Sequence, residues 1–91
     1  MNDQRQLIND VETLGRLIRD ARKAQGLTQQ EFADVAGVGV RFLSEVERGK
    51  ETAEVGLVLK VLAMAGFDLL VEHRSHRSPF AHLIDDPQGS S

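Results

Sequence analysis

The sequence lacks cysteine, tryptophan and tyrosine, and it contains only two prolines among 91 residues. Without cysteine there is no disulfide to stabilise the chain, which is typical of a protein that works in a reducing compartment. A domain of this size buries little surface, so we expect it to gain stability by associating with another chain. No apolar run approaches the roughly 20 residues that a membrane helix needs, and residues 1–10 carry no apolar signal core. These absences indicate one small soluble domain.

An excess of positive charge is also missing. Eleven basic and fourteen acidic side chains give a net charge of −3, whereas a protein that coats nucleic acid is expected to be basic. The acidic excess lies at the two ends, because residues 14–60 hold eight basic and seven acidic side chains, a net charge of +1. The charge therefore does not exclude DNA binding. It predicts few phosphate contacts and a modest non-specific affinity.

Apolar residues recur at spacings of three and four, in runs that are closed by glycine, and this pattern predicts helices. The expected helices cover residues 11–25, 29–36, 40–48 and 55–65. The second helix opens on Thr28-Gln29-Gln30-Glu31, which has the Ser/Thr-x-x-Glu form of a capping box. A link of about three residues around Gly37 favours a steep crossing between the second and third helices. This is the sequence form of a helix-turn-helix.

The pattern changes after the fourth helix. Phe67, Leu69 and Val71 share one face at a spacing of two, which predicts a β-strand. A single strand has no partner elsewhere in this chain, so we expect it to pair with the same strand of a second copy. The predicted organisation is an N-terminal arm (1–9), a helix-turn-helix domain (10–66), a dimerisation strand (67–73) and a flexible tail (74–91). The fold class is therefore mainly α, with one short C-terminal β-strand.

The outer face of the third helix carries the candidate DNA-reading residues, which are Gly39, Val40, Arg41, Ser44 and Glu45. Arg41 suits guanine, Val40 suits a thymine methyl group, and Glu45 can accept a hydrogen bond from cytosine. Free amides near Thr28 and Gln29 suit a phosphate. Plainer interpretations stay open: Arg41 as a solvated arginine, Val40 as a packing residue, and Glu45 as a surface residue or a device against wrong sequences.

The sequence offers little for catalysis. It contains no Ser/His/Asp or Cys/His set on ordered elements, no glycine-rich phosphate loop followed by lysine, and no metal-ligand spacing. His73, His76 and His82 lack the further ligands and the scaffold of a metal site. We therefore expect no enzyme activity, cofactor or metal. An apolar segment at residues 79–84 is either idle tail or a piece that orders when it docks on a partner.

Three runs carry a family resemblance: residues 26–33, Gly37-Val38, and residues 42–50. They resemble the Xre/lambda-repressor family of bacterial helix-turn-helix regulators, and within it most of all the HipB-type antitoxins. The resemblance implies a lambda-repressor-like DNA-binding domain of four to five helices, followed by a short strand that pairs in the dimer. It implies a cytoplasmic, nucleoid-associated autorepressor of a type II toxin–antitoxin operon. Such a protein binds palindromic double-stranded operator DNA as a homodimer and neutralises a HipA-type kinase toxin.

The same resemblance assigns roles to individual residues. Gln29 matches a glutamine that contacts phosphate and braces the recognition helix, and Arg22 with Glu47 matches a partly buried ion pair. Arg48 and Lys50 match phosphate contacts. Position 39 often holds a serine or threonine that reaches DNA, and Gly39 lacks that hydroxyl. Two alternatives remain: a stand-alone Xre-family regulator without a toxin partner, and a protein-interaction module whose main role is toxin binding.

Overall fold

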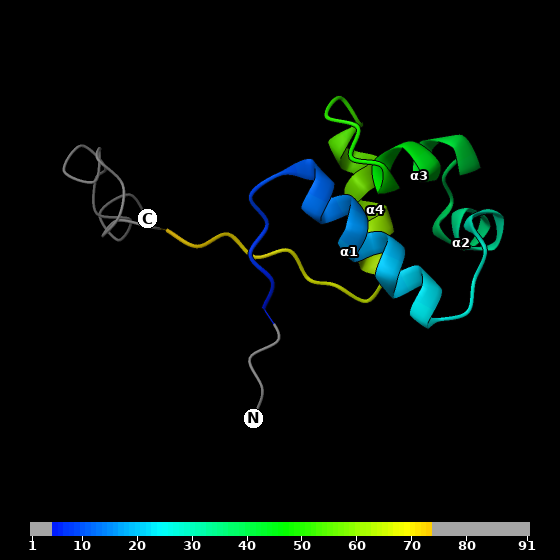
Figure 1. Cartoon of the computed structure of the whole chain (residues 1–91), viewed down its shortest axis with the longest axis horizontal. Coiled ribbons are helices and arrows are strands. Elements are labelled where there is room, and N and C mark those ends of the chain that lie inside the picture. Colours follow the sequence, from blue (N-terminus) through cyan, green and yellow to red (C-terminus); the bar gives the residue numbers. More distant parts are fainter. Residues whose placement is uncertain (1–4, 74–91) are drawn as a thin grey trace.

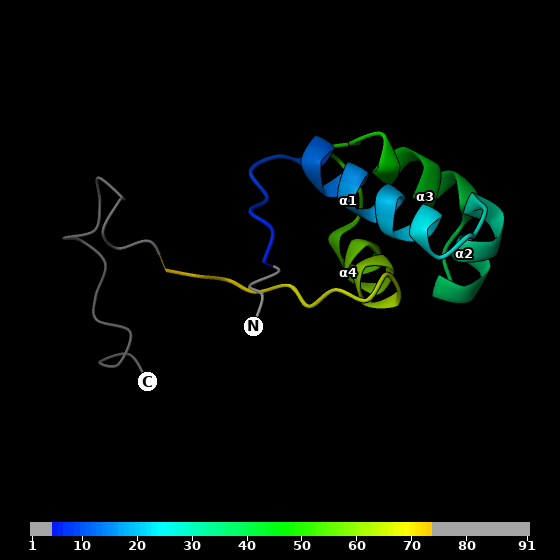
Figure 2. The ribbon, with the colours of Figure 1, turned by 60° about the horizontal axis from the view of Figure 1, so that its bottom comes forward.

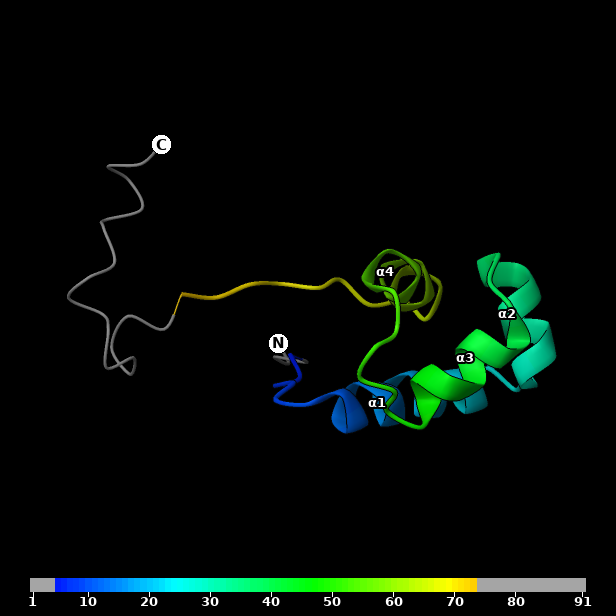
Figure 3. The same ribbon diagram turned by 90° about the horizontal axis from the view of Figure 1, so that it is seen from above.

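The computed structural model describes residues 5–73, which contain four α-helices. These are α1 (Val11–Ala24), α2 (Gln29–Ala36), α3 (Val40–Glu47) and α4 (Val55–Met64). Helix α1 packs against α3, and α2 contacts both α3 and α4 (Figure 1). Seen from above, α1 and α3 run side by side, and a loop carries the chain from the end of α3 to α4 (Figure 3). The four predicted helices are thus confirmed, and the helical part is a four-helix domain.

The helix ends are set by local hydrogen bonds that the sequence pattern predicts. The Asp10 carboxylate accepts a hydrogen bond of 2.7 Å from the amide of Thr13 at the start of α1. At the start of α2 the Glu31 amide donates to the Thr28 hydroxyl, and the Thr28 amide donates to the Glu31 carboxylate. Gly37 ends α2 with a φ of 76°, in the left-handed region that favours glycine. Helices α1 and α2 therefore begin where a capping side chain of their own sequence satisfies a terminal amide.

The core lies where the four helices meet. Its largest fully buried side chains come one from each helix: Ile18, Phe32, Leu43 and Val61. Burying side chains of this size is the main favourable contribution to folding, at roughly 1.5–3 kcal/mol each. One core contact is made by a residue with no side chain, Gly15 of α1, which is buried against the end of α3.

At Gly15 the two helix backbones are in direct contact. A Cβ placed there would lie 2.7 Å from the carbonyl oxygen of Glu47, and closer still to that of Val46. Sequence reasoning missed this role. The one available signal was the position of Gly15 three residues before the core residue Ile18, which puts both on the same helix face.

Residues 67–73 form no strand in the described chain. They follow α4 as an extended segment that leads away from the helices (Figure 2). Leu69 is 58% exposed and Val71 is 95% exposed. A strand exists only when its backbone groups bond to a neighbour, and residues 5–73 provide none. Pairing with a second copy therefore stays a prediction. The tail at 74–91, with the apolar segment 79–84, and the first four residues of the arm lie outside the described residues.

Within residues 5–73, no helix has both the length and the apolar character needed to cross a membrane.

Candidate nucleic-acid interface

Helix α3 has one buried and one exposed face. Leu43, Val46 and Glu47 point into the protein, with at most 7% of each residue exposed. On the opposite side the Arg41 side chain is 90% exposed and Val40 is 37% exposed. Gly39 precedes the helix as its N-cap, and no side chain caps it. The helix therefore presents polar side chains outward on a rigid element, which is the arrangement that base reading requires.

The exposed face of α3 and the loop after it gather five polar or charged side chains that bond to one another. The Glu45 carboxylate lies 3.4 Å from Arg41 Nε and 3.0 Å from Lys50 Nζ. The Arg48 guanidinium donates to the Ser44 hydroxyl over 2.7 Å. The hydrogen bond from Lys50, with a smaller contribution from Arg41, holds the pKa of the Glu45 carboxyl below its usual value. We call this surface the α3 face, and it consists of Val40, Arg41, Ser44, Glu45, Arg48 and Lys50.

Beneath the α3 face a buried carboxylate joins three parts of the fold. The Arg22 Nε and Nη2 atoms donate to the two Glu47 oxygens at 2.7 and 3.0 Å, and both residues are only 7% exposed. The remaining Arg22 nitrogen donates to the carbonyl of Leu27 at 2.8 Å. The hydrogen bonds that Arg22 donates to the Glu47 carboxylate raise the pKa of Arg22, so the guanidinium is held charged. The pair thus fixes α1 to the end of α3.

Gln29 extends this network to the start of α2. Its Nε2 donates to Glu47 Oε1 over 2.9 Å. Because Gln29 is the first residue of α2 and Glu47 is the last residue of α3, this bond joins the start of α2 to the end of α3. One hydrogen of the Gln29 amide group is used in this bond, and the second hydrogen on Nε2 is left for another acceptor. The predicted bracing role of Gln29 therefore has a geometric basis in this contact.

The candidate phosphate site at the start of α2 consists of the amides that the capping box leaves open. The amide of Thr28 is not one of them, because it donates to the Glu31 carboxylate at 2.9 Å. The capping box leaves the next two backbone amides, those of Gln29 and Gln30, at the open end of the helix. An anion at this end would meet these amides and the Gln29 side chain rather than Thr28.

Three contacts of this region were not foreseen from the sequence: the Glu45–Arg41 pair, the Glu45–Lys50 pair, and a hydrogen bond of 3.3 Å from Lys60 Nζ to the carbonyl of Gly37. The last contact attaches α4 to the turn of the helix-turn-helix. Each joins residues whose proximity depends on the folded backbone. The spacing of four between Arg41 and Glu45 was the one local signal.

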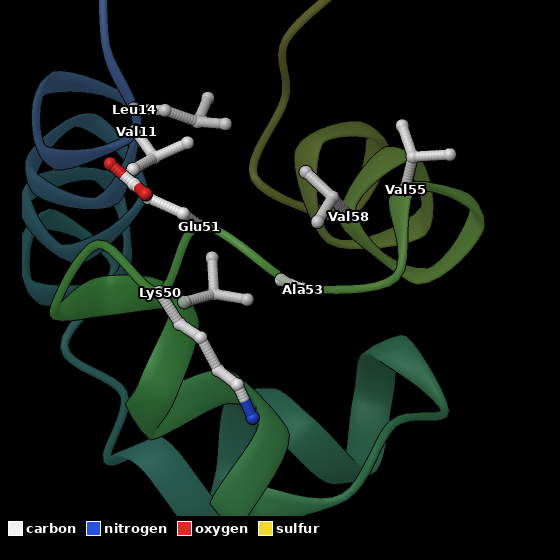
Figure 4. Close-up of a pocket in the computed structure, with 8 residues that line it drawn as sticks. Val11, Leu14, Lys50, Glu51, Ala53, Val55 and Val58 are labelled. Carbon is white, nitrogen blue, oxygen red and sulfur yellow. The ribbon is translucent and has the colours of Figure 1, made fainter.

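An apolar groove of about 240 Å³ lies beside the α3 face, between α1, the end of α3 and the start of α4. Figure 4 shows its aliphatic lining, with the Lys50 ammonium directed over α3 and away from the other labelled side chains. The lining residues are Val11, Leu14, Val46, Lys50, Glu51, Ala53, Val55 and Val58. Across the described part of the chain, no three His, Cys, Asp or Glu side chains gather in a way that could hold a metal ion.

Comparison with known proteins places this geometry among DNA-binding regulators. Residues 18–69 match the family model described as helix-turn-helix. The chain is 53% identical over 53 residues to the HTH-type transcriptional regulator y4mF of Sinorhizobium fredii, which covers 58% of this chain and 70% of that protein. It is 45% identical over 40 residues to the transcriptional regulator ClgR of Mycobacterium tuberculosis, which covers 44% of this chain and 36% of that protein.

A solved structure of a HipA-HipB-O2-O3 complex contains a chain with the same fold. The TM-score is 0.69 at 20% sequence identity, and the match covers 77% of this chain and 99% of that chain. At this identity the likeness concerns the fold alone.

Proposed function

The chain belongs to the helix-turn-helix family of DNA-binding transcriptional regulators, which is not a family of enzymes. From that premise we propose that it is a sequence-specific repressor that binds palindromic operator DNA as a homodimer. The observation that carries this proposal is the α3 face, where exposed Arg41 and its polar neighbours lie on one side of the helix. On the buried side, Glu47 holds the helix in place through its bonds with Arg22 and Gln29. The repressor would act in the bacterial cytoplasm, on the nucleoid.

In the proposed complex each copy places α3 in a major groove. Arg41 contacts a guanine and Val40 contacts a thymine methyl group, while Arg48 and Lys50 meet phosphates after the helix. The start of α2 holds a further phosphate through Gln29 and the free backbone amides. A dimer would bind two half-sites that are one helical turn, about 34 Å, apart.

The dimer is proposed to form through residues 67–73. Of the three residues predicted to share one face, Leu69 and Val71 are more than half exposed in the single chain, and pairing with a second copy would satisfy the extended backbone beside them. Phe67 is half-buried against the core of its own chain. A variant that lacks residues 67–91 should sediment as a monomer and bind a single half-site weakly. A truncated protein that still sediments as a stable dimer would contradict the strand-mediated pairing.

The finer proposal is that the protein is the antitoxin of a HipA-type kinase toxin and represses their shared operon. Its support is the resemblance of the sequence to HipB-type antitoxins and a fold shared with a chain of the HipA-HipB-O2-O3 complex. A stand-alone regulator is the second candidate, because the relatives y4mF and ClgR are named only as transcriptional regulators. A HipA-like kinase frame beside this gene favours the antitoxin, and its absence excludes that role.

Arg41→Ala tests the recognition surface. Loss of a bidentate contact to guanine should weaken binding to the protein's own promoter by about 1–3 kcal/mol and relax the preference at one base pair. Arg19→Ala is the matched control, because it removes the same charge from the exposed side of α1. If Arg41→Ala and the control have the same promoter affinity, base preference and salt dependence, α3 does not read DNA. A wild-type protein that binds the toxin but not its promoter would instead be a protein-interaction module.

A further inference from the structure

Glu45 occupies an unusual place for a residue on a DNA-facing surface. Its carboxylate lies between two cations that would meet DNA, with Oε2 3.4 Å from Arg41 Nε and Oε1 3.0 Å from Lys50 Nζ. Its side chain is 23% exposed, whereas the side chains of Arg41 and Lys50 are 90% and 46% exposed. The acid thus lies lower on the α3 face than the two cations that it pairs with.

The backbone after α3 places Lys50 over this carboxylate. Gly49 has a φ of 87°, and the amide of Lys50 donates to the carbonyl of Glu45 at 3.0 Å. This bond runs from the third residue past the helix to a carbonyl in its last turn, and it folds the chain back on itself. The backbone therefore holds Lys50 close to Glu45, in addition to the attraction between their charges.

The ion pairs of Glu45 reduce the positive charge that the α3 face presents to a phosphate backbone. Non-specific DNA binding comes from cations that neutralise phosphates, so each cation that is already paired contributes less. Arg41, Arg48 and Lys50 make three positive charges on the α3 face, and Glu45 reduces the sum to two. To contact the phosphates of random DNA, Arg41 and Lys50 must break their pairs with Glu45. If the pairs stay intact, the negative charge of Glu45 comes close to the phosphates.

We propose that Glu45 is a specificity-determining positioning residue, which lowers non-specific DNA affinity by holding Arg41 and Lys50 in ion pairs until a cognate site replaces them. The proposal rests on the DNA-binding function proposed above. At the operator, a base contact by Arg41 and a phosphate contact by Lys50 replace both pairs. Random sequence still offers Lys50 a phosphate, but it offers Arg41 no matching base, so the lost Arg41–Glu45 pair is not replaced. Glu45 therefore widens the gap between operator and random DNA without touching a base.

The test compares Glu45→Gln with Glu51→Gln on a random-sequence duplex across a range of salt concentrations. Glu51 is an exposed acid directly after Lys50, so its variant makes the same charge change nearby. Glu45→Gln should bind random DNA about fivefold more tightly than Glu51→Gln does, a gain expected for two released surface pairs. The slope of log affinity against log salt should steepen by about one. The ratio of promoter to random affinity should fall.

A third variant checks that the effect passes through Lys50. In a Lys50→Gln background, the gain in random-DNA affinity from Glu45→Gln should be smaller than in the wild type, because one of its two cations is gone. NMR titration of the Glu45 carboxyl without DNA provides a separate readout. Its pKa should rise toward the usual value in Lys50→Gln.

Each contrary result has a distinct meaning. Equal random-DNA affinity in Glu45→Gln and Glu51→Gln overturns the inference, as does a Glu45 pKa that Lys50→Gln does not move. A changed preference at one operator base pair with unchanged random binding would mean that Glu45 reads that base, which also overturns it. A wild-type protein that binds neither its promoter nor random DNA removes the proposed function, and the inference with it.

Discussion

The contact between α1 and α3 at Gly15 predicts that one substitution has opposite effects at two helical glycines. Gly15 lies inside α1 and Gly56 lies in the first turn of α4. Alanine is a better helix former than glycine by up to about 1 kcal/mol in a helix interior, so propensity alone favours Gly→Ala at both positions. Only the surroundings of the added methyl group differ.

The structure gives the sign and size of each effect. At Gly15 the new Cβ would lie 2.7 Å from the Glu47 carbonyl oxygen and closer to that of Val46, and these are backbone atoms that move only if a helix moves. Overpacking of this kind costs about 1–3 kcal/mol or more, which exceeds the gain in propensity. At Gly56 the nearest atom is the flexible end of Glu54, 3.9 Å away, so a gain of about 0.5 kcal/mol should remain.

Thermal unfolding followed by far-UV circular dichroism measures both effects, at one protein concentration because dimerisation adds to stability. A net loss of about 2 kcal/mol should lower the melting temperature of Gly15→Ala by roughly 10 °C, whereas Gly56→Ala should melt at or slightly above the wild type. A Gly15→Ala variant as stable as Gly56→Ala would refute the close backbone contact between α1 and α3.

Three further predictions concern the ion pair and the helix ends. Glu47→Ala should cost about 3–5 kcal/mol in urea unfolding, because it leaves the Arg22 guanidinium buried without a counter-ion, whereas the double change Arg22→Met with Glu47→Leu should cost less than the sum of the single changes. The hydrogen bond from Thr13 lowers the pKa of Asp10, so the carboxylate contributes its full stability above the usual value of 3.8 and loses it as the pH falls toward the folded-state pKa. The difference in melting temperature between the wild type and Asp10→Asn should therefore shrink as the pH falls below 3.8. Gly39→Ser should stabilise the protein by about a few tenths of a kcal/mol, because the N-cap has a φ of −72°, no side-chain bond and nothing within 4 Å of an added Cβ; a lower melting temperature would contradict this.

Local signals in the sequence were enough to predict the four helices. Thr28 and Glu31 carry a capping box whose two hydrogen bonds form within four residues, and Gly37 takes the positive φ that ends the same helix. These features depend on neighbours along the chain, so they can be read without the fold. The outward face of α3 follows in the same way, because Leu43 and Val46 define the inward one.

Features that depend on tertiary contacts could not be predicted from the residues themselves, and the Arg22–Glu47 pair was expected only because of the family resemblance. Gly15 and Gly56 are both glycines in helices, and only the approach of the α3 backbone distinguishes them. Glu45 was expected to face outward, but its bond to Lys50 depends on the turn at Gly49. The period of two at residues 67–73 predicts a strand correctly only if a second chain supplies the neighbour.

The separation of the two faces of α3 has a consequence for how such a regulator changes over evolutionary time. Val40 and Arg41 belong to no part of the buried core, whereas Glu47 holds α1, α2 and α3 together. In the proposed mode of binding, substitutions at the first two positions would alter the preferred DNA sequence at little cost to folding, since exposed positions usually tolerate change within about 0.5 kcal/mol. Duplicated copies in one genome would then acquire different target sites by single mutations, while the scaffold that presents the helix stays the same.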